Sequence, residues 1–85
     1  MRYQRIDLNL LIALDALLAE RNVTRAAERM HMTQSAMSGV LSRLRDYFED
    51  SLLVPMGRSM QLTPRAESLI EPVRNIILQV DATLG

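Results

Sequence analysis

Small polar side chains and one arginine are concentrated between residues 33 and 43 of this 85-residue chain. The set comprises Thr33, Gln34, Ser35, Ser38, Gly39, Ser42 and Arg43. Glutamine and arginine can each form paired hydrogen bonds with the edge of a nucleic-acid base, and hydroxyl groups bond bases or phosphates. The set therefore suits recognition of a polar, anionic surface. It supplies no nucleophile paired with an activating base.

An apolar stripe in the same segment predicts the helix that would hold this set on one side. Thr33 is a favoured helix cap. A 3.6-residue wheel places the apolar face on Met37, Val40, Leu41, Leu44 and Phe48. The opposite side carries Ser35, Gly39 and Ser42, flanked by Ser38 and Arg43. The helix thus offers a low polar surface that can enter the major groove of DNA.

A shorter helix is predicted before this one, with Thr24 as its cap and its end near His31. Ala26 and Ala27 lie within it, and small side chains let two helices cross closely at the steep angle of a helix-turn-helix motif. Residues 23–45 are therefore interpreted as a DNA-reading helix-turn-helix. An ordinary helical hairpin with a solvated outer face is the alternative.

Two details favour the DNA-reading interpretation. The first turn of the second helix, residues 34–36, contains no acidic residue, so its free amides can hold a phosphate. Gly39 lies inside the predicted helix, where glycine costs roughly 1 kcal/mol relative to alanine. Close approach of the helix backbone to DNA would explain this glycine, and so would a tolerated weak position.

Two short β-prone segments follow, at residues 52–54 and 60–62, and the loop from Pro55 to Ser59 separates them. The pattern predicts a hairpin, or wing, in which Gly57 takes the turn conformation. Arg58 at its tip can contact the minor groove or the DNA backbone. A solvated loop arginine is the alternative.

Helices are also predicted at both ends of the chain. Asp7 can cap a helix that ends near Glu20, with Arg21 and Asn22 as its exit. Because this helix is apolar almost all round, it needs a second burial surface, supplied by the C-terminal helix or a partner. The residues assigned mainly to the core are Leu11, Ile12 and Leu18.

Thr63 and Pro64 form a strong helix start near the C-terminus. The apolar residues that follow recur at spacings of three, four and seven, as in a coiled-coil seam, and Pro72 is predicted to kink the helix. This pattern predicts a dimerisation helix. The candidate dimerisation residues are Leu69, Val73, Ile76, Ile77 and Val80.

Composition restricts the classes of function. There is no cysteine and only one histidine, so disulfides and the usual cysteine or multi-histidine metal sites are not expected. No catalytic constellation or glycine-rich phosphate loop is present. The formal net charge is zero and all ten basic residues are arginine, so DNA affinity must come from a local patch. No apolar run is long enough to span a membrane, and the lack of cysteine permits a reducing cytoplasm.

The segment from Thr24 to Leu44 contains a distinctive pattern: paired alanines, a Thr-Gln pair, an Ala-Met-Ser triplet and a later leucine. The residues are Ala26, Ala27, Thr33, Gln34, Ala36, Met37, Ser38, Leu41 and Leu44. This pattern resembles the DNA-binding segment of the LysR-type transcriptional regulators. The segments DLNLL at Asp7–Leu11, RLRDYF at Arg43–Phe48 and LTP at Leu62–Pro64 resemble the branch that contains nodulation and aromatic-degradation regulators.

The sequence departs from this family pattern at Gly39, Val40, Arg45 and Pro55. Many relatives have long polar residues at 39 and 40, a glutamate at 45 and an arginine at 55. The resemblance implies DNA contacts at Gln34, Ser35 and Ser38. Base contacts of relatives are not carried over to positions 39, 40 and 55.

The residues and the resemblance predict a mainly α fold: a winged helix-turn-helix with a short two-stranded β wing and a long C-terminal dimerisation helix. Residues 1–62 are expected to form the DNA-binding domain and residues 63–85 the linker and dimerisation helix, while the family's effector-binding domain is absent from this chain. The candidate DNA-binding residues are Thr33, Gln34, Ser35, Ser38, Gly39, Ser42, Arg43 and Arg58.

The expected function is sequence-specific binding of double-stranded DNA by a homodimer in the cytoplasm. Neither enzyme activity nor a membrane, metal or cofactor is expected for this chain, and a small-molecule effector is expected only for the absent domain. The alternative is a nonenzymatic helical dimerisation or protein-interaction module. Salt-dependent duplex binding distinguishes the two, because only phosphate contacts release counterions.

Overall fold

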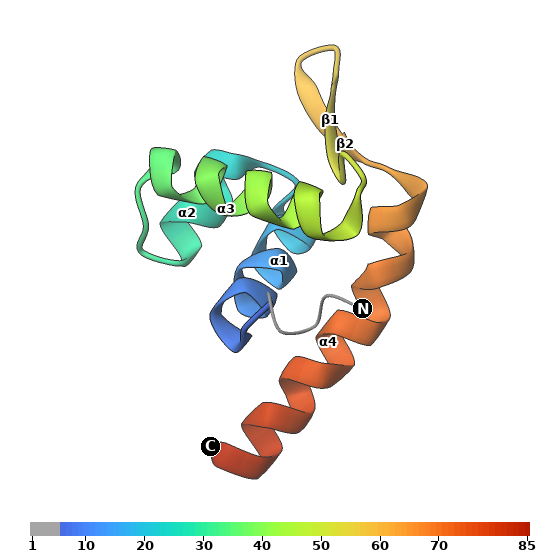
Figure 1. Ribbon diagram of the computed structural model, residues 1–85. Coiled ribbons are helices and arrows are strands. Elements are labelled where there is room, and N and C mark those ends of the chain that lie inside the picture. The colour runs from blue at the N-terminus through green and yellow to red at the C-terminus, as the bar shows by residue number, and fades with distance from the viewer. Residues whose placement is uncertain (1–5) are drawn as a thin grey trace.

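Four helices and one β-hairpin make up residues 6–85 in a computed structural model of the chain (Figure 1). The elements are α1 (Leu8–Glu20), α2 (Val23–Arg29), α3 (Gln34–Phe48), β1 (Leu53–Met56), β2 (Ser59–Leu62) and α4 (Pro64–Leu84). This order confirms the predicted mainly α fold with a two-stranded wing and a long last helix. Residues 1–5 of the predicted domain 1–62 lie outside the described residues.

The caps predicted for three of the helices are confirmed. The side chains of Asp7, Thr33 and Thr63 accept hydrogen bonds of 2.8, 3.0 and 3.1 Å from the backbone N–H three residues further on. Each cap satisfies one of the N–H groups that a helix start leaves without a partner. These short-range interactions fix where α1, α3 and α4 begin.

The start of α2 differs from the prediction. Asn22, rather than Thr24, caps the helix, and its side-chain oxygen accepts a 2.8 Å hydrogen bond from the N–H of Arg25. Arg21 takes a left-handed conformation with φ of 54°, which turns the chain directly after α1 and places Asn22 at the next helix start. Thr24 therefore lies inside the first turn. The helix ends at Arg29, two residues earlier than predicted.

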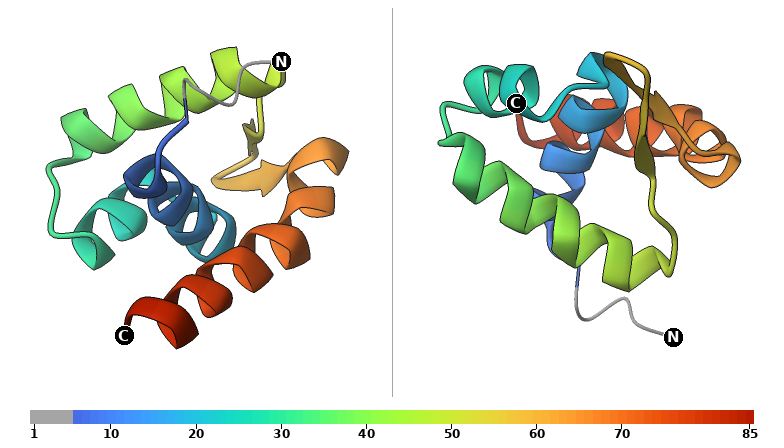
Figure 2. Two further views of the ribbon diagram at one scale, coloured as in Figure 1. Left: turned by 60° about the horizontal axis from the view of Figure 1, so that its bottom comes forward. Right: turned by 90° about the horizontal axis from the view of Figure 1, so that it is seen from above.

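Helix α1 lies between α3 and α4 and also contacts α2 (Figure 2). Leu18 is buried, as predicted, but Leu11 and Ile12 are only half-buried and do not form the main core face. The reason is that the surrounding helices cover a different arc of α1. The buried apolar residues of α1 are Leu10, Ala13, Leu14, Ala16, Leu17 and Leu18.

The predicted apolar stripe of α3 is confirmed as its core face. Met37, Leu41 and Leu44 are buried, and Val40 and Phe48 are half-buried. This stripe packs on α1 and α2, so the opposite face of α3 points away from the core.

The wing is an antiparallel hairpin with longer strands and a shorter turn than predicted. Pro55 lies in β1, paired with Met60, and only Gly57 and Arg58 separate the strands. Both strands of a two-stranded sheet are edge strands, where proline is tolerated. Gly57 has φ of 64°, as predicted for the turn residue. Glycine at the first position of a two-residue turn is typical of a type II′ hairpin.

A hydrogen-bonded corner joins the end of α3 to the start of α4. One carboxylate oxygen of Asp50 accepts hydrogen bonds from the Thr63 hydroxyl, at 2.6 Å, and from the N–H of Leu52, at 2.8 Å. The Thr63 bond first, and the Leu52 bond second, lower the pKa of the Asp50 carboxyl below its ordinary value of 3.8. Leu52 is buried with a left-handed φ of 64°, so this corner also holds a backbone conformation that leucine rarely adopts.

Acid should weaken the fold through Asp50. A carboxyl with a lowered folded-state pKa contributes stability above its unfolded pKa, and this contribution is lost as the pH falls through the folded pKa. Between about pH 5 and pH 2, the free energy of unfolding should therefore fall more steeply for wild type than for Asp50→Asn. Urea unfolding followed by circular dichroism measures this, with Glu71→Gln, which removes an exposed carboxyl from α4, as the control. A constant difference between wild type and Asp50→Asn across this range would contradict the role of Asp50.

Candidate nucleic-acid interface

The polar set predicted on the outer face of α3 is exposed at every position. Its members are Thr33, Gln34, Ser35, Ser38, Gly39, Ser42 and Arg43. The structure therefore brings seven of the eight candidate DNA-binding residues onto one helix and its cap. Its surface is low, because only Gln34 and Arg43 have long side chains.

The start of α3 presents free backbone donors. The first helical hydrogen bond runs from the N–H of Met37 to the carbonyl of Thr33, at 3.0 Å, so the N–H groups of Gln34 and Ser35 come before it. The first turn contains no acidic residue. Free amides and the positive end of the helix dipole both favour an anion here, such as a DNA phosphate.

Gly39 has no packing reason to be glycine. A Cβ atom built at this position would meet nothing within 4 Å. Its backbone is also outside the left-handed region that favours glycine. The glycine keeps the exposed face low at the centre of the polar set, which agrees with both sequence-based explanations, close approach of DNA and a tolerated weak position.

Helix α2 packs against the core-facing side of α3 and fixes its position. Ala26 and Ala27 are almost completely buried, so α2 packs closely on both α1 and α3. The N–H of Met32 donates a 2.8 Å hydrogen bond to the carbonyl of Ala27, which closes the turn between the helices. His31 occupies this turn in a left-handed conformation with φ of 56° and is exposed.

Arg45 anchors the wing to α3. Its Nε donates a 2.7 Å hydrogen bond to the carbonyl of Ser51, and its Nη2 donates one of 2.7 Å to the carbonyl of Leu53. Sequence reasoning registered Arg45 only as a departure from a family pattern. Its partners are backbone carbonyls, which no residue type marks, so the sequence holds no complementary signal for this contact.

The wing places Arg58 at its tip, as predicted, where it is exposed. In Figure 1 the hairpin rises beside the end of α3, on the side of the molecule opposite to the C-terminal end of α4. The eighth candidate residue therefore comes from a separate element. The Arg45 hydrogen bonds hold that element relative to α3.

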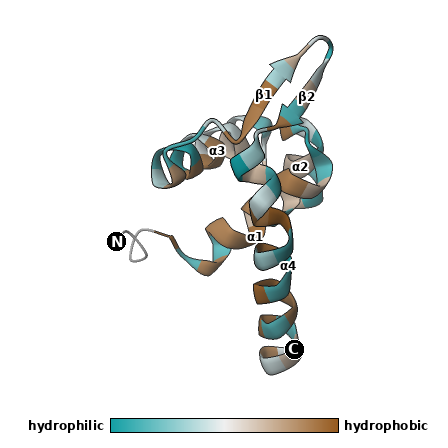
Figure 3. Cartoon of the chain, turned by 90° about the vertical axis from the view of Figure 1, so that its right-hand side faces the viewer, coloured by the Kyte–Doolittle hydropathy of each residue, from teal (hydrophilic) through white to brown (hydrophobic). Residues whose placement is uncertain are grey.

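The predicted dimerisation set does not form one exposed stripe on α4. Val73 is only 3% exposed because it packs in the core of its own chain, so little of its surface is left for a partner. Ile76 is 45% exposed, while Leu69, Ile77 and Val80 are half-buried. Leu78 and Leu84, which were not in the set, are exposed. Figure 3 shows the C-terminal part of α4 extending beyond the helical body, with hydrophobic and polar residues alternating along it.

Residues 6–85 contain no cluster of three or more side chains able to hold a metal ion. Within the same residues, no helix has the length and apolar character needed to cross a membrane.

A model of bacterial regulatory helix-turn-helix proteins of the lysR family matches residues 8–67, which contain α1–α3, the wing and the start of α4. The chain belongs to the LysR family. The resemblance recognised from the helix-turn-helix motif is therefore confirmed.

The relatives include nodulation proteins, as the segments Asp7–Leu11, Arg43–Phe48 and Leu62–Pro64 indicated. Nodulation protein D 2 of Rhizobium leguminosarum bv. phaseoli is 52% identical over 84 residues, which are 99% of this chain and 26% of that protein. Nodulation protein D 1 of Neorhizobium galegae is 50% identical, with 99% of this chain and 27% of that protein covered. The chain thus spans about a quarter of the length of these relatives.

Solved structures share the fold. A probable transcriptional regulator, PA0477 from Pseudomonas aeruginosa, superposes with a TM-score of 0.89 and 40% identity, covering 96% of this chain and 28% of that one. The protein in the BenM_DBD/catB site 1 DNA complex has a TM-score of 0.84 and 22% identity, covering 93% of this chain and 89% of that one. At 22% identity, the similarity to this second structure shows only that the two chains share a fold.

Proposed function

We propose that this chain is the DNA-binding part of a LysR-type transcriptional regulator and binds double-stranded DNA in a sequence-specific manner. The observation that carries the proposal is the outer face of α3, where every residue of the polar set is exposed. Its helix start combines two free amides with a first turn that lacks acidic residues. A face built only for solubility would not need this combination, because exposed helix faces usually carry charged side chains.

Each part of the interface has a distinct role. Gln34, at the start of α3, can pair with adenine through two hydrogen bonds. Ser35 and the free amides bind phosphate, and Ser38 and Ser42 bond bases or phosphates along the groove. Arg43 reaches guanine or the backbone. Thr33 orients the helix start, Gly39 lets the helix approach closely, and Arg58 contacts the minor groove or backbone from the wing.

The proposed active form is a homodimer in which residues 1–62 bind DNA and residues 63–85 join the two copies. Exposed apolar residues on α4 support this proposal, because Ile76, Leu78 and Leu84 are large apolar residues that their own chain leaves exposed. Two copies present two α3 helices to half-sites on the DNA. The dimerisation residues proposed from the sequence are kept, except that Val73 supports the seam only indirectly, through the core.

A small-molecule effector is proposed only for a further domain of the whole protein, and this chain itself needs no cofactor or catalytic step. The cytoplasm is the proposed location, because a bacterial regulator of this family acts on chromosomal DNA. A protein-interaction module is the competing function. It is favoured by the zero net charge, which gives no bulk attraction to DNA.

Salt-dependent binding to duplex DNA tests the proposal and the role of Arg58 together. The probe is a duplex of about 30 base pairs, or three helical turns, and binding is measured by fluorescence anisotropy over a range of salt concentrations. The logarithm of the association constant should fall linearly with the logarithm of salt. Arg58→Ala should reduce the slope by about 0.9 per subunit, the value for one phosphate contact, while Arg58→Lys should keep it.

Failure to bind the duplex, or binding without a salt slope, would contradict the proposed function and favour the protein-interaction module. Equal slopes for wild type and Arg58→Ala would contradict only the role of the wing.

Dimerisation is tested at Ile76, which is 45% exposed and so has apolar surface available to a partner. Ile76→Asp should raise the dissociation constant of the dimer at least about tenfold, because it places a charge in an apolar contact. Sedimentation velocity measures the dimer, and circular dichroism measures helix content, which should not change. Asn75→Asp, at an exposed polar position of the same helix, is the control. Equal dimer content in Ile76→Asp and wild type would place the seam elsewhere.

A further inference from the structure

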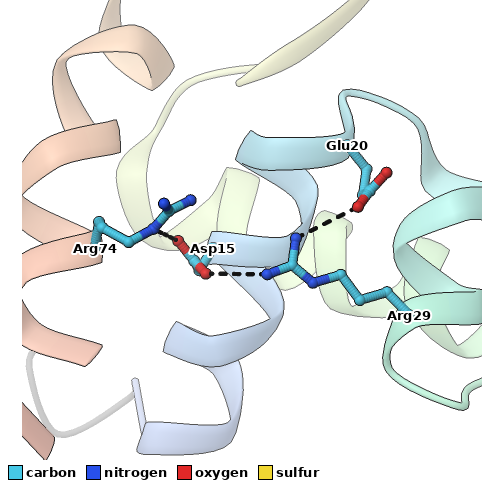
Figure 4. A network of polar contacts seen from close by, with 4 residues as sticks. All are labelled: Asp15, Glu20, Arg29 and Arg74. Carbon is cyan, nitrogen blue, oxygen red and sulfur yellow. Dashed lines mark hydrogen bonds and ion pairs between the residues drawn. The ribbon is translucent and has the colours of Figure 1, made fainter. Parts of the chain in front are cut away.

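One charged residue is buried within residues 6–85. It is Asp15 on the central helix α1, which is 8% exposed. Burying a carboxylate is costly unless opposite charges and hydrogen bonds compensate it. Two arginines from different helices do so. The Nε of Arg74 on α4 donates a 3.2 Å hydrogen bond to Oδ1, and Nη2 of Arg29 on α2 lies 3.7 Å from Oδ2 (Figure 4).

The two arginines connect different parts of the fold to the same carboxylate. Arg29 also donates a 3.4 Å hydrogen bond to Glu20, so it is held at the end of α1 as well. Arg74 lies beside Val73, the last residue of α4 that is completely buried. Among residues 6–85, the Arg74 bond is the only side-chain hydrogen bond between α4 and α1. It therefore lies near the C-terminal end of the packed part of α4, where Ile77 is the last partly buried apolar residue packed against the core.

We propose that the Asp15–Arg74 contact fixes the orientation of α4 relative to the helix-turn-helix and thereby selects the spacing of DNA half-sites that the dimer binds. Arg74 is a positioning residue in this proposal, since it acts through the dimer geometry and does not touch DNA. The inference rests on the proposed function, in which α4 joins the two copies.

The length of α4 makes its orientation important. About ten residues follow Arg74, and at 1.5 Å per residue they extend roughly 15 Å. A tilt of about 10° at the Asp15 contact would displace the end of such a helix by roughly 3 Å. Adjacent base pairs are separated by about 3.4 Å along the DNA axis. A small change in the angle of α4 therefore displaces the end of the helix by about as much as one base-pair step in half-site spacing.

Apolar packing alone leaves this angle less defined. The buried residues of α4 are Ala66 and Val73, which lie in its first half, and the residues after Val73 are exposed or half-buried. Apolar contacts are not directional, whereas a hydrogen bond between a guanidinium and a buried carboxylate is. Leu69, Ile70 and Ile77 add partly buried apolar contacts with the core. The Asp15 contact is thus the directional restraint near the outer end of the packed part of α4.

The test compares wild type with Arg74→Gln and Arg74→Lys. The probes are duplexes that carry two inverted copies of the half-site selected by wild type from random DNA, with the spacing changed by one base pair at a time. Wild type should lose about a hundredfold in affinity at a wrong spacing, because the second subunit can no longer bind. Arg74→Gln should lose less than about tenfold, with a broader optimum, while Arg74→Lys should stay close to wild type.

Glu71→Gln, which also changes one charge on α4, is the control and should keep the wild-type spacing profile. Removing one partner of a buried carboxylate should lower the melting temperature. An unchanged preference within a half-site, together with full helix content at the assay temperature by circular dichroism, would separate positioning from loss of fold. An identical spacing profile in Arg74→Gln and wild type would overturn the inference. If wild type binds no paired half-sites, the proposed dimeric function fails instead.

A second measurement tests the orientation of α4 without DNA. The chain has no cysteine, so spin labels can be placed at Glu28→Cys on α2 and Gln79→Cys on α4, both exposed positions. Electron–electron distances are measured with labelled chain diluted in unlabelled chain. Arg74→Gln should broaden or shift the distance distribution, and Arg74→Lys should restore it. An unchanged distribution in Arg74→Gln would also overturn the inference.

Discussion

Helix α1 can bury its leucines only if other helices cover it on several sides, because its apolar residues surround almost the whole helix. It contacts α2, α3 and α4, and six of its apolar residues are buried. This packing places α2 and α3 at one side and α4 at the other (Figure 2). The DNA-binding surface and the helix proposed for dimerisation are thus parts of one core, joined through the same central helix.

The core leaves the outer face of α3 without a structural role. Met37, Leu41 and Leu44 satisfy the packing requirements of the helix, and a side chain at Gly39 would touch nothing. Apart from Thr33, which caps the helix, the polar set is therefore free to be chosen for recognition. The wing is positioned by hydrogen bonds instead. Arg45 and Asp50 make these bonds and hold the chain between α3 and α4.

Sequence reasoning succeeded where local interactions determine structure. Thr33 and Thr63 cap their helices through contacts three residues away, and the stripe from Met37 to Leu44 follows directly from helical period. Glycine at the wing turn was predicted because few other residues adopt its positive φ. These signals lie within a few residues of the features they specify.

The sequence was misleading or silent in two situations: where two neighbouring residues could serve the same purpose, and where the partners lie far apart in the chain. Asn22 and Thr24 are both good capping residues, and only the left-handed turn at Arg21 decides between them. Val73 matched the period of a seam, but period alone does not tell which side of α4 meets α1. The contact of Asp15 with Arg74 spans 59 positions, so no local pattern could predict it.

Selection of binding sites from a random pool of duplexes shows whether the start of α3 reads DNA sequence. Wild type, Gln34→Ala and the control Gln79→Ala, which changes an exposed glutamine on α4, are each taken through the same selection. A good two-bond contact between glutamine and adenine discriminates by about 1 to 3 kcal/mol. Gln34→Ala should lose one base preference in each half-site, while the control should keep the wild-type sequence preference. An unchanged preference in Gln34→Ala would contradict the role of Gln34 in reading DNA sequence.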